Sequence, residues 1–145
     1  MTRYIIDASV YAPLIVIYGR DLIEKLRKIE FIILDLTVYE SCNAFWKEHM
    51  KFHKISRDEA LIACKVVKAL TRYMILYKVI DLNIEEAMKI AIENNITFYD
   101  SSYIALALKL KSPIISEDRD IISTAPKYGV EVVRLNQIIN ILKRT

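Results

Sequence analysis

The chain has 145 residues, of which 54% are hydrophobic, and its 21 basic and 18 acidic residues give a formal net charge of +3. This length and apolar content suit one compact domain, spanning residues 1–145, with a substantial core. Two cysteines without paired metal spacing argue against a disulfide framework or a zinc module, and the modest charge allows a polyanionic partner without demanding one.

The apolar stretch over residues 10–18 is the only part that resembles a targeting segment. Asp7 stands just before it, Pro13 lies inside it, and no small-residue cleavage site follows. The stretch is also too short to span a bilayer. We therefore expect a cytoplasmic protein with no membrane association, in which Cys42 and Cys64 are buried, reduced thiols.

Short β-rich runs alternate with segments in which apolar residues have helical spacing. This alternation predicts parallel strands joined by crossover helices. Residues 31–34 are apolar without alternation, as expected of a strand with helices over both faces. The sequence therefore predicts an α/β/α sandwich, with strands over Arg3–Asp7, Phe31–Leu36, Pro113–Ser116 and Val130–Leu135.

Helices are expected between and after these strands. The capping-box pattern Ser56-Arg57-Asp58-Glu59 marks the firmest helix start in the chain. The expected helical segments are Ser9–Lys28 with an interruption near Gly19, Val38–Phe52, Arg57–Lys78, Ile84–Asn94, Ser101–Lys109, a short turn after Glu117, and Gln137–Lys143.

Acidic residues follow the predicted strands. Asp7 ends the first strand, Glu40 lies four residues after Leu36, and Asp118 lies two residues after Ser116. Asp100 opens the helix that precedes the third strand. Because open α/β sheets bind ligands beyond the carboxyl ends of their strands, these four carboxylates are expected to converge.

Taken singly, each acid is better explained by helix capping, by the helix dipole or by a solvated turn. Taken together, they would repel one another unless protons or cations neutralised them. Hard divalent cations, Mg²⁺ or Mn²⁺, suit such a set of oxygen ligands.

The segments "YIIDASV", "LTVYESCNAFW", "FYDSSYIALALKLKSPIISEDRDI" and "YGVEVVRL" resemble, in order, the motifs of PIN-domain nucleases, especially VapC-type toxins. The resemblance implies a single PIN-like domain with a sheet of four or five strands. It also implies a homodimer, a small antitoxin partner and single-stranded RNA as substrate. By the same resemblance the catalytic and metal-binding acids are Asp7, Glu40, Asp100 and Asp118, with Ser9, Asn43 and Ser116 as polar neighbours.

The function expected is therefore a Mg²⁺- or Mn²⁺-dependent endoribonuclease. Asp7 and Asp100 would hold the metal, and Glu40 and Asp118 would be further or water-mediated ligands that help to activate a water. The alternative is a PIN-like module that binds RNA or a protein without cutting. All four acids are present, which favours the enzyme.

The segment "SEDRDI" offers three candidates for the fourth acid. We expect Ser116 to cap the short helix, and helical geometry alone leaves Glu117 and Asp118 both near the core side. The resemblance, with its Ser-x-Asp pattern, selects Asp118. Arg119 and Asp120 are then expected to face solvent, with Arg119 as a possible RNA contact.

Two further patterns are ambiguous. His49 and His53 have i, i+4 spacing, but without a third ligand they suggest phosphate contact rather than metal binding. The stretch Thr71–Lys78 is expected to end a long helix. It is either core or part of a dimer or antitoxin surface.

Overall fold

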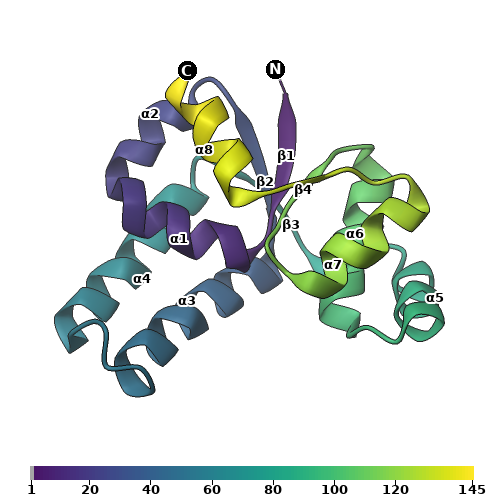
Figure 1. Cartoon of the computed structure of the whole chain (residues 1–145), viewed down its shortest axis with the longest axis horizontal. Helices are drawn as coiled ribbons and strands as arrows, with labels where there is room; N and C mark the ends of the chain where they lie inside the picture. The colour runs from purple at the N-terminus through teal and green to yellow at the C-terminus, as the bar shows by residue number, and fades with distance from the viewer. Residues whose placement is uncertain (1) are drawn as a thin grey trace.

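The computed structural model, which describes residues 2–145, has one five-stranded sheet with a layer of helices on each face (Figure 1). The strands are β1 (Arg3–Ile6), β2 (Glu30–Leu34), β3 (Ile75–Tyr77), β4 (Ile114–Ile115) and β5 (Val132–Val133). All four neighbouring pairs are parallel, in the order β3-β2-β1-β4-β5. The predicted α/β/α sandwich with a parallel sheet is confirmed.

The helices fall into two groups along the chain. Those before β3 are α1 (Ala8–Tyr18), α2 (Leu22–Leu26), α3 (Asp35–Met50) and α4 (Arg57–Thr71), with the 3₁₀ turn η1 at Gly19–Asp21. Those after it are α5 (Ile84–Asn94), α6 (Phe98–Leu110), α7 (Arg119–Thr124) and α8 (Leu135–Lys143), with 3₁₀ turns η2 at Val79–Asp81 and η3 at Ala125–Tyr128.

The sheet separates two hydrophobic cores because neighbouring residues of a strand point to opposite faces. Ile6 and Ile33 belong to the core under α1, α2, α4 and α8. Ile5 and Ile32 belong to the core under α5, α6 and α7. Figure 1 shows α1, α2, α4 and α8 on one side of the sheet and α5, α6 and α7 on the other. A strand buried on both faces must be apolar at every position, which explains the continuous apolar runs.

The strand order places a topological switch point between β1 and β4. The chain adds β2 and β3 on one side of β1, and then returns to add β4 and β5 on the other side. Right-handed crossovers running in opposite directions put their helices on opposite faces. The crevice beyond the carboxyl ends of β1 and β4 is thus where this fold leaves room for a ligand.

The expected long helix over Arg57–Lys78 is confirmed as far as Thr71 and is wrong beyond it. Helix α4 ends at Thr71, and Ile75–Tyr77 form β3, an edge strand paired in parallel with β2. β-Branched and aromatic side chains suit a pleated strand, and here sheet pairing overrode the helical pattern that precedes them. The exposed apolar residues of this stretch therefore lie at a sheet edge.

The structure agrees with two local expectations and contradicts a third. The capping box is confirmed, since the Ser56 hydroxyl accepts from Glu59 N–H and the Glu59 carboxylate accepts from Ser56 N–H. The interruption at Gly19 is confirmed, with φ +53°. The histidine pair does not share a helix face, because α3 ends at Met50 and His53 lies beyond it with φ +52°.

The two thiols expected to be buried, those of Cys42 and Cys64, are unpaired and only half-buried. No helix in residues 2–145 combines the length and the apolar character that a membrane crossing requires.

Candidate active site

The four acids singled out from the sequence line one cavity of about 260 Å³ at the carboxyl ends of β1 and β4. They come from four elements. Asp7 follows β1 and caps α1, Glu40 lies in the second turn of α3, Asp100 lies in the first turn of α6, and Asp118 precedes α7. Ser9, Asn43, Lys47 and Tyr103 also line the cavity. The sheet and both helical layers therefore all contribute to it.

Asp7 is the most deeply buried of these carboxylates, with 4% of its surface exposed. Its Oδ1 accepts from Ser9 N–H at 3.1 Å and from Ser9 Oγ at 2.5 Å, and its Oδ2 accepts from Ser116 Oγ at 2.6 Å. Burial raises the pKa of Asp7 to about 6, against the hydrogen bonds from the two serines, which lower it. A carboxylate placed here binds a proton or a cation more readily than one in water.

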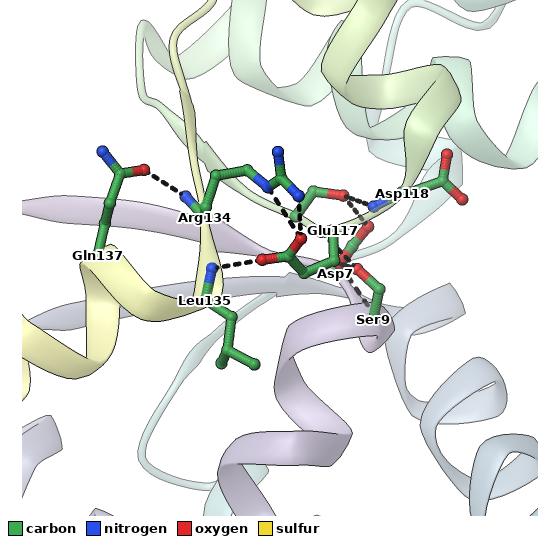
Figure 2. A network of polar contacts seen from close by, with 8 residues as sticks. Asp7, Ser9, Glu117, Asp118, Arg134, Leu135 and Gln137 are labelled. Atoms are coloured by element: carbon green, nitrogen blue, oxygen red, sulfur yellow. Dashed lines mark hydrogen bonds and ion pairs between the residues drawn. The ribbon is translucent and has the colours of Figure 1, made fainter.

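Ser9 and Ser116 join the loop after β4 to Asp7. Figure 2 shows Ser9 and Asp7 beside Glu117 and Asp118 of this loop. Ser116 Oγ accepts from Asp118 N–H at 2.9 Å, and Ser9 Oγ accepts from Glu117 N–H at 2.9 Å. Each hydroxyl thus donates to Asp7 and accepts from the loop. Two residues named from the sequence as polar neighbours hold the loop and the acid of β1 at a fixed separation.

Glu40 is held by a chain of hydrogen bonds that begins in the sheet. Leu34 N–H donates to Thr37 Oγ1 at 3.2 Å, Thr37 Oγ1 lies 2.9 Å from Tyr103 Oη, and Tyr103 Oη donates to Glu40 Oε1 at 2.7 Å. Because the Tyr103 hydroxyl donates to Glu40, the Thr37 hydroxyl must donate to Tyr103. Burial raises the pKa of Glu40, and the hydrogen bond from Tyr103 lowers it.

Asp100 is the third residue of α6, and not the residue just before the helix as expected. The helix starts at Phe98 with Thr97 as its cap, so the expected start at Ser101 was three residues late. Burial, and then the negative charges of Asp118 and Asp120, raise the pKa of Asp100 to about 7. A proton or a cation is therefore favoured at Asp100.

Asp118, and not Ser116, caps the short helix α7. Its Oδ1 accepts from Asp120 N–H at 2.9 Å and from Ile121 N–H at 3.3 Å. Our expectation that Ser116 would cap this helix was wrong, because its hydroxyl is already engaged by Asp7 and the loop. Capping fixes the orientation of the Asp118 carboxylate toward the cavity.

Asp120 is exposed, as expected, but it also belongs to the acidic cluster. Asp100, Asp118 and Asp120 each offer an oxygen within 4.8 Å of the others. Spacing alone could not show this, because Asp100 comes from a distant part of the chain. Asp120 is thus a fifth carboxylate beside the four that were expected from the sequence.

The Glu117 side chain contacts the start of α8 (Figure 2), and Glu117 does not line the cavity. Its Oε2 accepts from Arg134 Nε at 2.8 Å and also contacts Arg134 Nη2, and its Oε1 accepts from Leu135 N–H at 2.9 Å. The ion pair with Arg134, and then the bond from Leu135, lower the pKa of Glu117. Glu117 is therefore engaged by α8, whereas Asp118 lines the cavity and Asp120 lies close to Asp100 and Asp118.

Basic side chains flank the acidic cavity. Lys47 lines it from α3, where it lies one turn after the exposed Asn43. The exposed Arg119 lines a second cavity, of about 740 Å³, that shares Ser9 and Asp118 with the first. Arg119 was named as a possible RNA contact from the sequence, whereas Lys47 and Tyr103 were not named as site residues. Helical spacing from Glu40 and from Asp100 could have indicated both.

The carboxylates of the cavity fit a hard divalent cation. The groups that converge are carboxylate and hydroxyl oxygens, and Asp7 and Asp100, with raised pKa values, lie among like charges. Mg²⁺ and Mn²⁺ are bound by such oxygens, whereas zinc sites favour histidine and cysteine. A cation would relieve the repulsion that the fold imposes on these acids.

Comparisons with known proteins give the same picture. A family model for the PIN domain matches residues 4–127. The chain is 31% identical over 134 residues to Exonuclease VapC9 of Pyrobaculum aerophilum, covering 92% of both chains. It is 26% identical over 129 residues to Ribonuclease VapC3 of the same organism, covering 86% of this chain and 95% of that one. The crystal structure of PAE2754 from Pyrobaculum aerophilum has a TM-score of 0.77 at 26% identity, covering 99% of this chain and 97% of that one.

Proposed function

Because the chain belongs to the PIN-domain family, we propose that it is a divalent-metal-dependent endoribonuclease that hydrolyses single-stranded RNA. The observation that carries the proposal is the convergence of Asp7, Glu40, Asp100 and Asp118 on one cavity. The relatives named as an exonuclease and a ribonuclease support a nuclease activity. A module that only binds RNA has no need of so many unneutralised acids in one place.

Asp7 and Asp100 would hold the cation, with Glu40, Asp118 and Asp120 as direct or water-mediated ligands. Bound there, Mg²⁺ or Mn²⁺ would lower the pKa of a water molecule and neutralise charge on the phosphoryl oxygens. Ser9 and Ser116 orient Asp7 by donating to its two oxygens. Tyr103 occupies Oε1 of Glu40, which leaves Oε2 to accept a hydrogen bond from a water.

The basic side chains would receive the RNA. Lys47 lines the carboxylate cavity, and Arg119 lines the adjoining cavity that shares Ser9 and Asp118 with it. Contacts from such side chains to the phosphate backbone carry no sequence information, so they position the strand without selecting a base. Because these contacts are electrostatic, cleavage should weaken as the salt concentration is raised.

The test uses circular single-stranded RNA and a linear RNA of the same sequence, each with Mn²⁺, Mg²⁺ or EDTA. An endoribonuclease linearises the circle with either metal and is inactive in EDTA. Degradation of the linear RNA alone would indicate an exonuclease. Cleavage that persists in EDTA, or binding without cleavage under every condition, would contradict the proposal and favour the binding module.

Asp7→Asn should abolish cleavage in this assay, since it removes the charge of the buried acid while keeping an acceptor for Ser9. The matched control is Asp58→Asn. Asp58 is an exposed acid in the first turn of α4, outside the cavity. Equal loss in both variants would show that charge alone, and not the site, was responsible.

We further propose a small antitoxin as partner. A groove of about 600 Å³, lined mostly by apolar side chains of α1, α3 and α4, includes the exposed Val16 and Ile62. Ala8 and Ser9 line both this groove and the carboxylate cavity, so a peptide seated there would end beside the site. The product of a short reading frame immediately upstream should copurify with the wild-type chain and not with Ile62→Glu. Equal copurification would contradict this location.

A homodimer is proposed as well. Residues 71–78 include the edge strand β3, and Tyr73 and Leu76 there expose 55% and 45% of their surfaces. Light scattering should give twice the chain mass of 16.9 kDa, and Leu76→Lys should reduce it. A monomeric wild type at all concentrations would contradict the dimer.

A further inference from the structure

We propose that Glu117 is a positioning residue that ties the loop bearing Asp118 to the N-terminus of α8 and so keeps the carboxylates at their binding separation. This inference rests on the proposed function, since the separation matters for a metal-dependent site. Glu117 itself lies outside the carboxylate cavity. Its role would be exerted through its neighbours.

The Glu117 carboxylate has three protein donors. Arg134 provides Nε at 2.8 Å and a second contact through Nη2, and Leu135 provides its backbone N–H at 2.9 Å. Leu135 is the first residue of α8, where a negative charge is favoured by the helix dipole and satisfies an unpaired N–H. Contacts to both Arg134 and Leu135 restrict the side chain more than a single surface ion pair would.

Helix α8 is a fixed anchor. Ile138 and Leu142 on it are fully buried in the core under α1 and α2. At its other end, Lys25 Nζ donates to the Leu142 carbonyl at 2.9 Å and Lys28 Nζ donates to the Thr145 carbonyl at 2.5 Å. An acid at the first turn and two lysines at the last both match the helix dipole.

The loop that Glu117 holds is short, with only residues 116–118 between β4 and α7. Glu117 N–H donates to Ser9 Oγ, while Ser116 on one side bonds Asp7 and Asp118 on the other side lines the cavity. A shift of Glu117 therefore moves Asp118 relative to Asp7. Groups that orient metal ligands typically change metal affinity by about 10- to 100-fold when removed.

The chain contains a matched control for this ion pair. Arg3 Nε contacts Glu30 Oε2 at 2.7 Å, with side chains 52% and 33% exposed, against 48% and 30% for Arg134 and Glu117. The Arg3–Glu30 pair joins the amino ends of β1 and β2, whereas the carboxylates lie beyond the carboxyl ends of the strands. Its loss should cost similar stability without reaching the site.

The experiment compares Glu117→Ala, Glu117→Gln and Glu30→Ala with the wild type. Amide exchange is measured in EDTA over residues 116–121, and Mn²⁺ affinity is measured by calorimetry. Glu117→Ala should speed exchange in this loop and weaken Mn²⁺ binding by about tenfold. Glu117→Gln, whose amide oxygen still accepts from Leu135 N–H, should lie between Glu117→Ala and wild type. Glu30→Ala should leave both readouts unchanged.

The inference is overturned if Glu117→Ala leaves loop exchange at the wild-type rate, or if it and Glu30→Ala alter Mn²⁺ affinity equally. Failure of the proposed function gives a different result, in which the wild type neither binds Mn²⁺ nor cleaves RNA. Loop exchange in the metal-free protein still decides the positioning role in that case.

Discussion

Ser116 and Asp7 lie 109 positions apart in the chain, and the Ser116 hydroxyl donates to Asp7 Oδ2 at 2.6 Å. The oxygen of the same hydroxyl accepts from Asp118 N–H at 2.9 Å. Ser116 is fully buried. One side chain therefore links the acid after β1 to the acid after β4.

Ser116→Ala should lower the free energy of unfolding by about 1–3 kcal/mol, because it leaves Asp7 Oδ2 and Asp118 N–H without their shared partner. It should also raise the pKa of Asp7 further, since the hydrogen bond from Ser116 lowers it. Ser116→Thr keeps the hydroxyl and should retain most of the cleavage activity. Urea unfolding and RNA cleavage measure the two effects. Equal activity of the two variants would show that the hydroxyl is dispensable.

Asp7 should make the metal-free protein lose stability as the pH rises. Its pKa is 3.8 as a free side chain and about 6 in the fold, so the folded protein binds this proton more tightly. The resulting stabilisation is complete below pH 4 and disappears as the pH passes 6. At 1.36 kcal/mol per pKa unit it amounts to about 3 kcal/mol.

Asp7→Asn removes this pH dependence while keeping an acceptor for the start of α1. The difference in unfolding free energy between variant and wild type, measured in EDTA, should therefore move in favour of the variant between pH 4 and pH 8. A difference that stays constant over this range would mean that Asp7 is not the group that titrates. Strong destabilisation of the variant at every pH would indicate that Asp7 serves only to cap α1.

Metal should raise the melting temperature of the wild type more than that of Asp100→Asn, because a cation that binds only the folded state stabilises it. Asp100 lies among Asp118 and Asp120, so its loss removes repulsion as well as a ligand. Without metal the variant should be neutral or more stable. Asp58→Asn, with its acid in an equivalent first helical turn of α4, should respond to Mn²⁺ as the wild type does.

Asp118→Asn should lose more cleavage activity than Asp120→Asn. Asparagine still caps α7 through its Oδ1, so the comparison separates charge from folding. Asp120 is exposed, but its carboxylate lies within reach of Asp100 and Asp118, so its loss should be intermediate. Activities are compared at equal unfolding free energy. A larger loss at Asp120 would make Asp120 the principal acid of this segment.

The position of the carboxylate site could be predicted because it depends on features written locally in the chain. A buried apolar run followed by Asp7, and another followed by Ser116 and Asp118, place these groups at one edge of a parallel sheet. The fold class followed from the same runs. Neither required knowledge of a distant contact, whereas the choice of Asp118 over Glu117 rested on the family resemblance.

The missed features depend on partners that are distant in sequence. β3 forms because β2 offers it an open edge, which no local pattern of residues 71–78 reveals. Asp118 caps α7 because Ser116 is already bound to Asp7. The link from Thr37 through Tyr103 to Glu40 spans both sides of the site, and Tyr103 could be found only from its spacing to Asp100.

The parallel pairing of β1 with β4 sets a time order on the ribosome. Ile5 pairs with Ile114 and Ile6 with Ile115, so more than a hundred further residues must be synthesised after β1 before these strands can meet. Contacts between residues so far apart form late, because closing a long loop costs entropy before any pairing compensates for it. Asp7 is therefore synthesised long before Asp118, and it remains without this partner in the meantime. The carboxylate cavity is therefore assembled only after Asp118 has been synthesised, and a shorter nascent chain carries its acids without the site.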